Sequence, residues 1–258
     1  MKRICDFTVR DIKLLDYNDF ELFVTSDEEL EPVYAGQFVN ILVPDTQKTF
    51  LRRPVSICGV DYTENELHFY IRIVGNGTQT LSLLQKGDKI NILYPLGNTF
   101  TVEKVKNPLL VGGGCEIAPL LFLSKTFTDK NIRPVMLMGG QTADALSWTN
   151  DFYTSANVHH ITNDGSMGEQ GLVTEHSILK NIEQFDRIYA CGPEVMMKAI
   201  AKMAVAANIP CEVSLENTMA CGIGACLCCV TETTQGNRCV CTDGAIFDIQ
   251  ELNNFINK

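Results

Sequence analysis

Six cysteines lie within 21 residues near the end of this 258-residue chain, and they constrain its fold more than any other feature. The chain has eleven cysteines, an odd number, so they cannot all pair in internal disulfides. The opening residues 1–6 lack the apolar core of a signal peptide, which favours the cytoplasm, where thiols stay reduced. A dense group of reduced thiols predicts a metal site. The six are Cys221, Cys226, Cys228, Cys229, Cys239 and Cys241.

The spacing of these cysteines favours an iron–sulfur cluster over zinc. Cysteines separated by four and then two residues, with another farther on, form the plant-type 2Fe–2S pattern. Gly222 and Gly224 let the backbone turn tightly and aim amide groups at inorganic sulfide. Zinc remains an alternative, but structural zinc sites usually have two separate pairs of ligands. For the last ligand we favour Cys241 over Cys239, expecting both on one face of a strand. The predicted ligands are Cys221, Cys226, Cys229 and Cys241, with Cys228 as a bystander.

Hydrophobic patterning divides the chain into three segments and predicts an α+β multidomain protein. In residues 1–102, short alternating strands separated by turns predict an antiparallel barrel or sandwich. In residues 103–211, apolar strands alternate with helical stretches such as 118–123, which predicts an α/β domain with a parallel sheet. Residues 212–258 are predicted to form a small cysteine-rich domain, which is too small to be stable without a metal site or another cross-link. The expected strands are 4–10, 20–25, 37–43, 53–59, 66–74 and 88–93, then 109–111, 135–138, 158–162 and 187–190.

Two motifs in the first segment are compatible with a flavin nucleotide. Residues 53–56 read Arg-Pro-Val-Ser, either a strand with solvated arginines or an arginine near a diphosphate and a serine beside a flavin ring. Residues 75–78 read Gly-Asn-Gly-Thr, either a plain turn or a nest of N–H groups for a pyrophosphate. Their order, ahead of a nucleotide-type segment, favours the flavin interpretation.

The second segment carries signals for a dinucleotide. Gly112, Gly113 and Gly114 follow an apolar strand and precede a helix, which suits a phosphate. The turn 191–193, Cys-Gly-Pro, ends the last strand, where such sheets bind ligands. Residues 134–179 contain no Lys or Arg and five acids, whereas a 2′-phosphate normally needs an arginine, so we predict NAD rather than NADP. The net charge of 21 − 31 = −10 argues against nucleic acid, and no apolar run is long enough for a membrane helix.

The order of these motifs resembles the electron-transfer subunits of NAD-dependent, class 1B dihydroorotate dehydrogenases, within the ferredoxin–NADP reductase superfamily. The resemblance spans the chain and is most specific at residues 219–229 and at Cys241-Thr242-Asp243-Gly244. It implies an FAD-binding barrel, an NAD-binding α/β domain and a 2Fe–2S domain. It also implies an FMN-containing catalytic subunit as partner, two copies of each chain forming a heterotetramer for dihydroorotate oxidation in pyrimidine (UMP) biosynthesis.

By motif match, the resemblance assigns binding residues but no catalytic ones. The turn at Asp164-Gly165-Ser166 and residues 191–193 would border the nicotinamide pocket. The four histidines are expected to be structural, which fits an electron conduit whose cofactors carry the chemistry. The residues implied to bind FAD are Arg53, Pro54, Val55, Ser56, Tyr70, Ile71, Arg72, Gly77 and Thr78, and those near NAD are Gly112, Gly113, Gly114, Cys191, Gly192 and Pro193.

One departure from the family pattern concerns the glycine turn, which usually continues with a small residue and another glycine. Here Cys115 and Glu116 follow. A carboxylate suits the start of a helix but would repel a docking pyrophosphate, which opposes tight binding of NAD. Two other interpretations remain open at this point. One is a related FAD and 2Fe–2S subunit of a sulfide dehydrogenase or hydrogenase, and the other is a zinc-stapled binding module.

Overall fold

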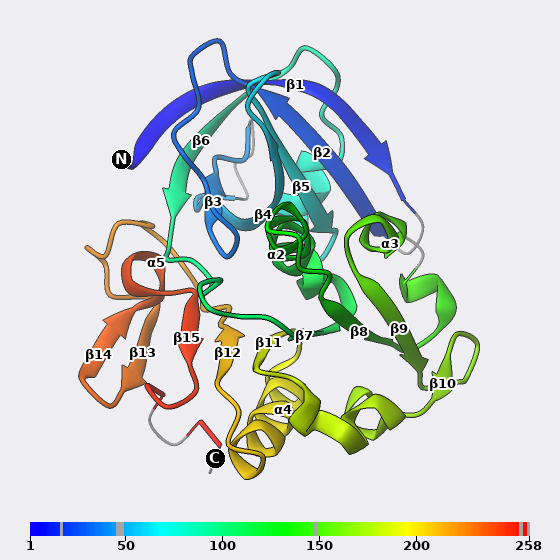
Figure 1. Ribbon diagram of the computed structural model, residues 1–258. Coiled ribbons are helices and arrows are strands. Elements are labelled where there is room, and N and C mark those ends of the chain that lie inside the picture. The colour runs from blue at the N-terminus through cyan, green and yellow to red at the C-terminus, as the bar shows by residue number, and fades with distance from the viewer. Residues whose placement is uncertain (16–17, 45–48, 147–148, 253–254, 257–258) are drawn as a thin grey trace. The chain divides into compact units, whose positions relative to one another are not determined.

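The computed structural model describes all residues except 16–17, 45–48, 147–148, 253–254 and 257–258, and it leaves out the side chain of Cys115. The described chain forms two compact units (Figure 1). Unit 1 comprises Met1–Thr99, Glu216–Thr231 and Arg238–Ala245. Unit 2 comprises Phe100–Leu215, Glu232–Asn237 and Ile246–Lys258. The domain boundaries after residues 102 and 211 stay predictions.

Unit 1 is built on a closed antiparallel barrel with the strand order β1-β2-β5-β4-β3-β6. Alternating apolar residues such as Phe20, Leu22 and Val24 fill its interior. The predicted barrel is therefore confirmed. The first strand is longer than expected because residues 3–8 pair with β6 while residues 8–14 pair with β2. The strands are β1 (Arg3–Leu14), β2 (Asp19–Thr25), β3 (Phe38–Ile41), β4 (Arg53–Asp61), β5 (Glu66–Arg72) and β6 (Lys89–Leu96), and one helix, α1 (Asn76–Leu81), follows β5.

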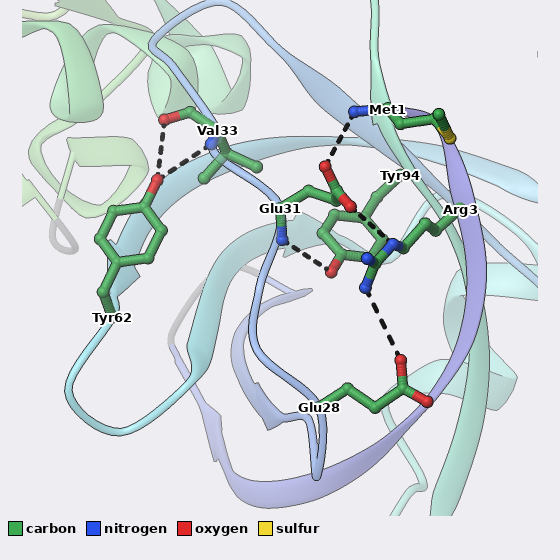
Figure 2. A network of polar contacts seen from close by, with 7 residues as sticks. All are labelled: Met1, Arg3, Glu28, Glu31, Val33, Tyr62 and Tyr94. Atoms are coloured by element: carbon green, nitrogen blue, oxygen red, sulfur yellow. Dashed lines mark hydrogen bonds and ion pairs between the residues drawn. The ribbon is translucent and has the colours of Figure 1, made fainter.

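Polar contacts tie the connection between β2 and β3 to the barrel (Figure 2). The Glu31 carboxylate accepts from the α-amino group of Met1 at 2.8 Å and from Arg3 Nε at 2.6 Å. These bonds, first of all the one from the α-amino group, hold the pKa of Glu31 below its usual value. The hydroxyl of Tyr62 accepts from the Val33 N–H at 2.9 Å. This loop is therefore a fixed part of unit 1.

Unit 2 contains a seven-stranded sheet in the order β10-β9-β8-β7-β11-β12-β15. Its pairs are parallel except for β12 with β15. Fully buried runs such as Leu109–Val111 are typical of parallel strands covered on both faces. The predicted α/β organisation is confirmed. The strands are β7 (Pro108–Gly113), β8 (Val135–Gly140), β9 (Asn157–Thr162), β10 (Glu169–Gln170), β11 (Arg187–Cys191), β12 (Cys211–Ser214) and β15 (Ile246–Asp248), and the α-helices are α2 (Ala118–Asp129), α3 (Phe152–Ser155) and α4 (Glu194–Ala206).

Short helices and a small hairpin complete the chain. The 3-10 helices are Gly114–Ile117, Ala143–Leu146, Thr149–Asp151, Val173–Glu175 and Ser177–Gln184. Strands β13 (Val230–Thr233) and β14 (Gly236–Cys239) pair with each other and lead into helix α5 (Val240–Asp243). Among the described residues, none of the helices is both long and apolar enough to span a bilayer.

One sequence-based expectation about the cysteines is wrong. Cys239 and Cys241 were expected on the same face of a single strand, but β14 ends at Cys239 and Cys241 lies in α5. The chain turns into a helix here because the Asp243 carboxylate accepts the Cys239 N–H at 3.0 Å. Thr242, on the same turn, hydrogen bonds both Asp243 and the carbonyl of Cys239. The two thiols therefore start from different elements.

Candidate functional site

Two motifs that are 24 residues apart in the sequence meet in unit 1. Arg53 begins β4, and Gly77 lies in the first turn of α1. A Cβ atom placed on Gly77 would come within 2.5 Å of Arg53 Nε, so the guanidinium rests directly on the glycine. First-turn N–H groups of a helix have no partner within the helix. The arrangement therefore gathers a cation and backbone donors, the groups that bind a diphosphate.

Thr78 holds the loop that leads into this helix. Its hydroxyl oxygen accepts from the N–H groups of Val74, at 2.9 Å, and Gly75, at 3.3 Å. The same hydroxyl donates to the Gly75 carbonyl at 3.2 Å. Thr78 is buried, so it serves as a brace for the loop backbone.

The remaining residues of the Arg-Pro-Val-Ser motif alternate along β4. Val55 is buried, Ser56 is half-buried and Pro54 is exposed. Pro54 stands opposite Asn40 of β3, and Ser56 stands opposite Phe38. Residues directly opposite each other in a sheet present their side chains on the same face. Pro54, Ser56, Asn40 and Phe38 therefore share the face that the flavin interpretation uses.

A buried carboxylate that the sequence analysis missed fixes Tyr70 and Arg72. Asp19, at the start of β2, pairs in register with Arg72 of β5 and is 2% exposed. Its carboxylate accepts two hydrogen bonds from Arg72, Nε and Nη2, both at 2.8 Å, and one from the Tyr70 hydroxyl. Ile71 is buried between them in sequence. No sequence signal marks Asp19, because its role depends on strand register.

In unit 2, both predicted turns lie at the place where the strand order reverses. The sheet grows from β7 toward β8 on one side and toward β11 on the other, and Gly112 pairs with Cys191. A Cβ on Gly192 would come within 3.0 Å of the Gly113 backbone, and one on Gly113 would meet Pro193 at 3.2 Å. Open α/β sheets bind ligands at this switch point, beyond the carboxyl ends of the strands.

Two acidic residues lie at the same edge of the sheet. Asp164 and Ser166 lie in the turn that follows β9, where Asp164 Oδ1 accepts from Ser166 N and Oγ at 3.0 and 2.6 Å. The bonds from Ser166 hold the pKa of Asp164 below its usual value. Glu116 lies in the 3-10 helix that follows the glycine turn. This edge therefore carries negative charge.

The cysteine loop, residues 221–229, is part of the barrel unit. A Cβ on Gly222 would come within 2.7 Å of Asn40 Nδ2 and within 3.2 and 3.3 Å of Leu93 and Leu96. Gly222 and Gly224 have φ values of +72° and +80°, which favour glycine. Both glycines are thus required by the backbone of the loop.

Backbone N–H groups point at the sulfur atoms of this loop. Ile223 and Cys226 each donate to Cys221 Sγ at 3.4 Å. Gly224 donates to Cys241 Sγ at 3.2 Å, and Cys241 donates to Cys229 Sγ at 3.5 Å. These bonds join the loop to α5 and would stabilise the electron-rich sulfur of a cluster. Because the Gly224 N–H donates to the sulfur of Cys241, the structure favours Cys241 over Cys239 as the fourth ligand.

The acidities of two of these thiols differ because their surroundings differ. The amide donors, Ile223 first among them, lower the pKa of Cys221 to about 6. Burial, together with a hydrogen bond to Cys229, raises the pKa of Cys241 to about 12. A bound metal favours the thiolate form of its cysteine ligands. Cys221 therefore forms a thiolate readily without a metal, whereas Cys241 would become a thiolate only when it binds one.

The donor set fits a cluster better than a single ion. In a 2Fe–2S cluster with four cysteines each iron takes two of them. Four thiols within one loop and its neighbouring helix, with amides aimed at sulfur, suit such a group.

Comparison with known proteins gives concordant matches. The family model described as the iron–sulfur cluster binding domain of dihydroorotate dehydrogenase B matches residues 216–253. The Bacillus caldolyticus protein described as dihydroorotate dehydrogenase B (NAD(+)), electron transfer subunit, is 36% identical over 251 residues, 95% of this chain and 96% of that protein. Its Fusobacterium nucleatum counterpart is 34% identical over 255 residues, 95% and 96% of the two chains. A solved chain from a study of flavin-based electron bifurcation by an NADH-dependent reduced ferredoxin-NADP oxidoreductase has a TM-score of 0.86 and 28% identity, covering 96% and 89% of the two chains.

Proposed function

This chain belongs to the family of electron transfer subunits of dihydroorotate dehydrogenase B (NAD(+)), and from that premise we propose how its residues serve electron transfer. The chain passes electrons from a catalytic partner subunit, through a 2Fe–2S cluster and FAD, to NAD. The Arg53 motif and the cysteine loop lie in one compact unit, and this supports our placement of the FAD and cluster sites most strongly. Both cofactors of a conduit would therefore be held by the same body.

We assign the flavin site to the β4, β5 and α1 residues of unit 1. Arg53 and the first turn of α1, around Gly77 and Thr78, would hold the diphosphate. Pro54, Val55 and Ser56 would place the flavin against β4. Tyr70, Ile71 and Arg72 of β5 would line the same site, and Asp19 keeps the first and last of these three in position.

We assign the cluster to Cys221, Cys226, Cys229 and Cys241, and NAD to the switch point of unit 2. There the turns 112–114 and 191–193 would receive the dinucleotide. Residues 134–179 contain no Lys or Arg, so they would offer a 2′-phosphate no cationic partner. When bound, the flavin can exchange a hydride with NAD and single electrons with the cluster.

The cysteine loop offers an exposed edge for the partner. Ile223 and Leu227 are 55% and 64% exposed, and Cys226 lies between them in sequence and is also exposed. Exposed apolar side chains beside a ligand cysteine are suited to docking a catalytic subunit close to the iron. We propose that this subunit contains FMN and that two copies of each chain assemble. None of the described cysteines forms a disulfide, which fits our placement of the chain in the cytoplasm.

Reconstitution tests this function directly. The anaerobically purified chain should contain FAD and iron and should oxidise NADH with an artificial acceptor. With a dihydroorotate-oxidising partner it should reduce NAD, and without the partner it should not act on dihydroorotate. A chain that holds iron but no flavin, or that supports no NAD reduction in the assembled complex, would contradict the assignment.

A further inference from the structure

Asn40 is a buried polar side chain whose hydrogen-bonding capacity goes unused within the chain. It lies in β3 and is 0% exposed. Among the residues that the structure describes, neither its Nδ2 nor its Oδ1 atom has a hydrogen-bond partner. Buried amides are nearly always satisfied, because leaving one unpaired costs its full desolvation. A fully buried amide of this kind therefore indicates a partner that the polypeptide does not supply.

The position of Asn40 indicates which partner that is. A Cβ on Gly222 would lie 2.7 Å from Asn40 Nδ2, so the amide nitrogen lies directly beneath the first turn of the cysteine loop. Cys221, the residue before Gly222, is a proposed cluster ligand. On the other side, Asn40 stands opposite Pro54 of the flavin motif and shares its face of the sheet. Asn40 therefore lies between the two cofactor sites of unit 1.

The surroundings of Asn40 keep the amide in place. Its backbone carbonyl accepts from Arg52 Nη1 at 3.1 Å, and the same guanidinium nitrogen reaches the carbonyl of Asn91 on β6. Leu93, paired with Asn40 across β3 and β6, contacts Gly222 as well. Leu96 also lies beside Gly222, so the immediate surroundings of the Asn40 amide are largely apolar.

We propose that Asn40 is a hydrogen-bond donor to the sulfur shell of the cluster, through Nδ2 to the Cys221 thiolate or to a sulfide beside it. The inference rests on the proposed function and adds a residue that tunes it. Donors to cluster sulfur stabilise the reduced, more negative state and so raise the reduction potential. Glycine is then required at position 222 for two reasons. Its φ is positive, and a larger residue would displace the Asn40 amide.

The test is an EPR-monitored redox titration of the intact holoprotein and of Asn40→Leu, which keeps the size of the side chain and removes the donor. We expect the reduction equilibrium constant of the cluster to fall about tenfold, which for a one-electron couple is about 59 mV. The FAD potential and the contents of iron and FAD should be unchanged. Ile41→Val, a buried change on the opposite face of the same strand, is the matched control and should leave both potentials at the wild-type values.

The outcomes separate this inference from the function on which it rests. A cluster potential in Asn40→Leu equal to that of the wild type overturns the inference, and so does a shift confined to the flavin. If Asn40→Leu does not load, Asn40→Thr replaces it, because its hydroxyl is attached one bond nearer the backbone and cannot reach the loop. The same fall in potential is then expected. A wild-type chain without a reducible cluster would refute the proposed function itself.

Discussion

Replacing Gly77 by alanine would separate the stability of the barrel unit from its capacity to bind FAD. The new methyl group would lie 2.5 Å from Arg53 Nε and 3.1 Å from its Cζ, so the guanidinium must move. Because the guanidinium is the end of a flexible side chain, its displacement should lower the free energy of unfolding only slightly. Alanine also favours a helix over glycine by about 0.5–1 kcal/mol. We therefore expect the stability of Gly77→Ala to equal or slightly exceed that of the wild type.

The same change should weaken FAD binding because it displaces the cation assigned to the diphosphate. A hydrogen bond to a charged group contributes about 1.5–3 kcal/mol, which corresponds to roughly 10- to 150-fold in the dissociation constant. The assay is titration of FAD into the flavin-free chain, followed by flavin fluorescence, with thermal unfolding measured on the same samples. Weakened binding without loss of stability is the predicted signature.

Gly75 supplies a matched control two residues away. Its φ of 179° is extended backbone that any residue adopts, and a Cβ there meets nothing within 4 Å. Gly75→Ala should bind FAD as the wild type does. Normal FAD binding by Gly77→Ala would contradict a role of Arg53 at the diphosphate. Equal loss of affinity in both variants would also contradict it, because the effect would then belong to the loop and not to Arg53.

The cluster ligands, the dinucleotide site and a buried carboxylate of unit 2 can each be tested separately. Cys241→Ser should lose iron and visible absorbance whereas Cys239→Ser should keep both, as iron assays would show; equal loss in the two variants would leave the fourth ligand unassigned to Cys241. NADH should bind at least about tenfold more tightly than NADPH in titrations, because a 2′-phosphate normally needs an arginine and residues 134–179 contain none; equal affinities would contradict this. Burial raises the pKa of Glu212, despite its 3.0 Å ion pair with Arg187, so the folded chain takes up a proton there at a higher pH than the unfolded chain. In urea unfolding, the free energy of unfolding of the wild type relative to Glu212→Gln should therefore rise as the pH falls from neutral toward 4.5. A fall in this free-energy difference over the same pH range would contradict a raised pKa of Glu212.

The elements that could be predicted from the sequence are those with strong local patterns. The alternation in residues 20–25 and apolar runs such as 109–111 predicted strands, because the local pattern of each segment shows which of its side chains are buried. The cysteine spacing and its glycines likewise describe a single loop. The glycine turns at 112–114 and 191–193 were placed at strand ends, and the structure brings them together because β7 and β11 are neighbours.

Features that depend on pairing between distant segments could not be predicted in this way. Asp19 is important because strand register places it opposite Arg72, and nothing near residue 19 indicates that partner. Asn40 looks like an ordinary polar residue of a strand until the loop that covers it, some 180 positions later, is placed. The change from β14 into α5 between Cys239 and Cys241 was missed because it depends on the side-chain contacts of Asp243 and Thr242.

We infer that this one chain connects a flavin in its barrel unit to an iron–sulfur cluster in the cysteine loop of the same unit. Anaerobic titration of the purified chain with NADH, followed by visible absorbance and by EPR on the same samples, tests this most directly. We expect the flavin absorbance to bleach and the paramagnetic signal of a reduced 2Fe–2S cluster to grow as NADH is added. Bleaching of the flavin without any such signal, in a chain that contains its iron, would contradict this inference.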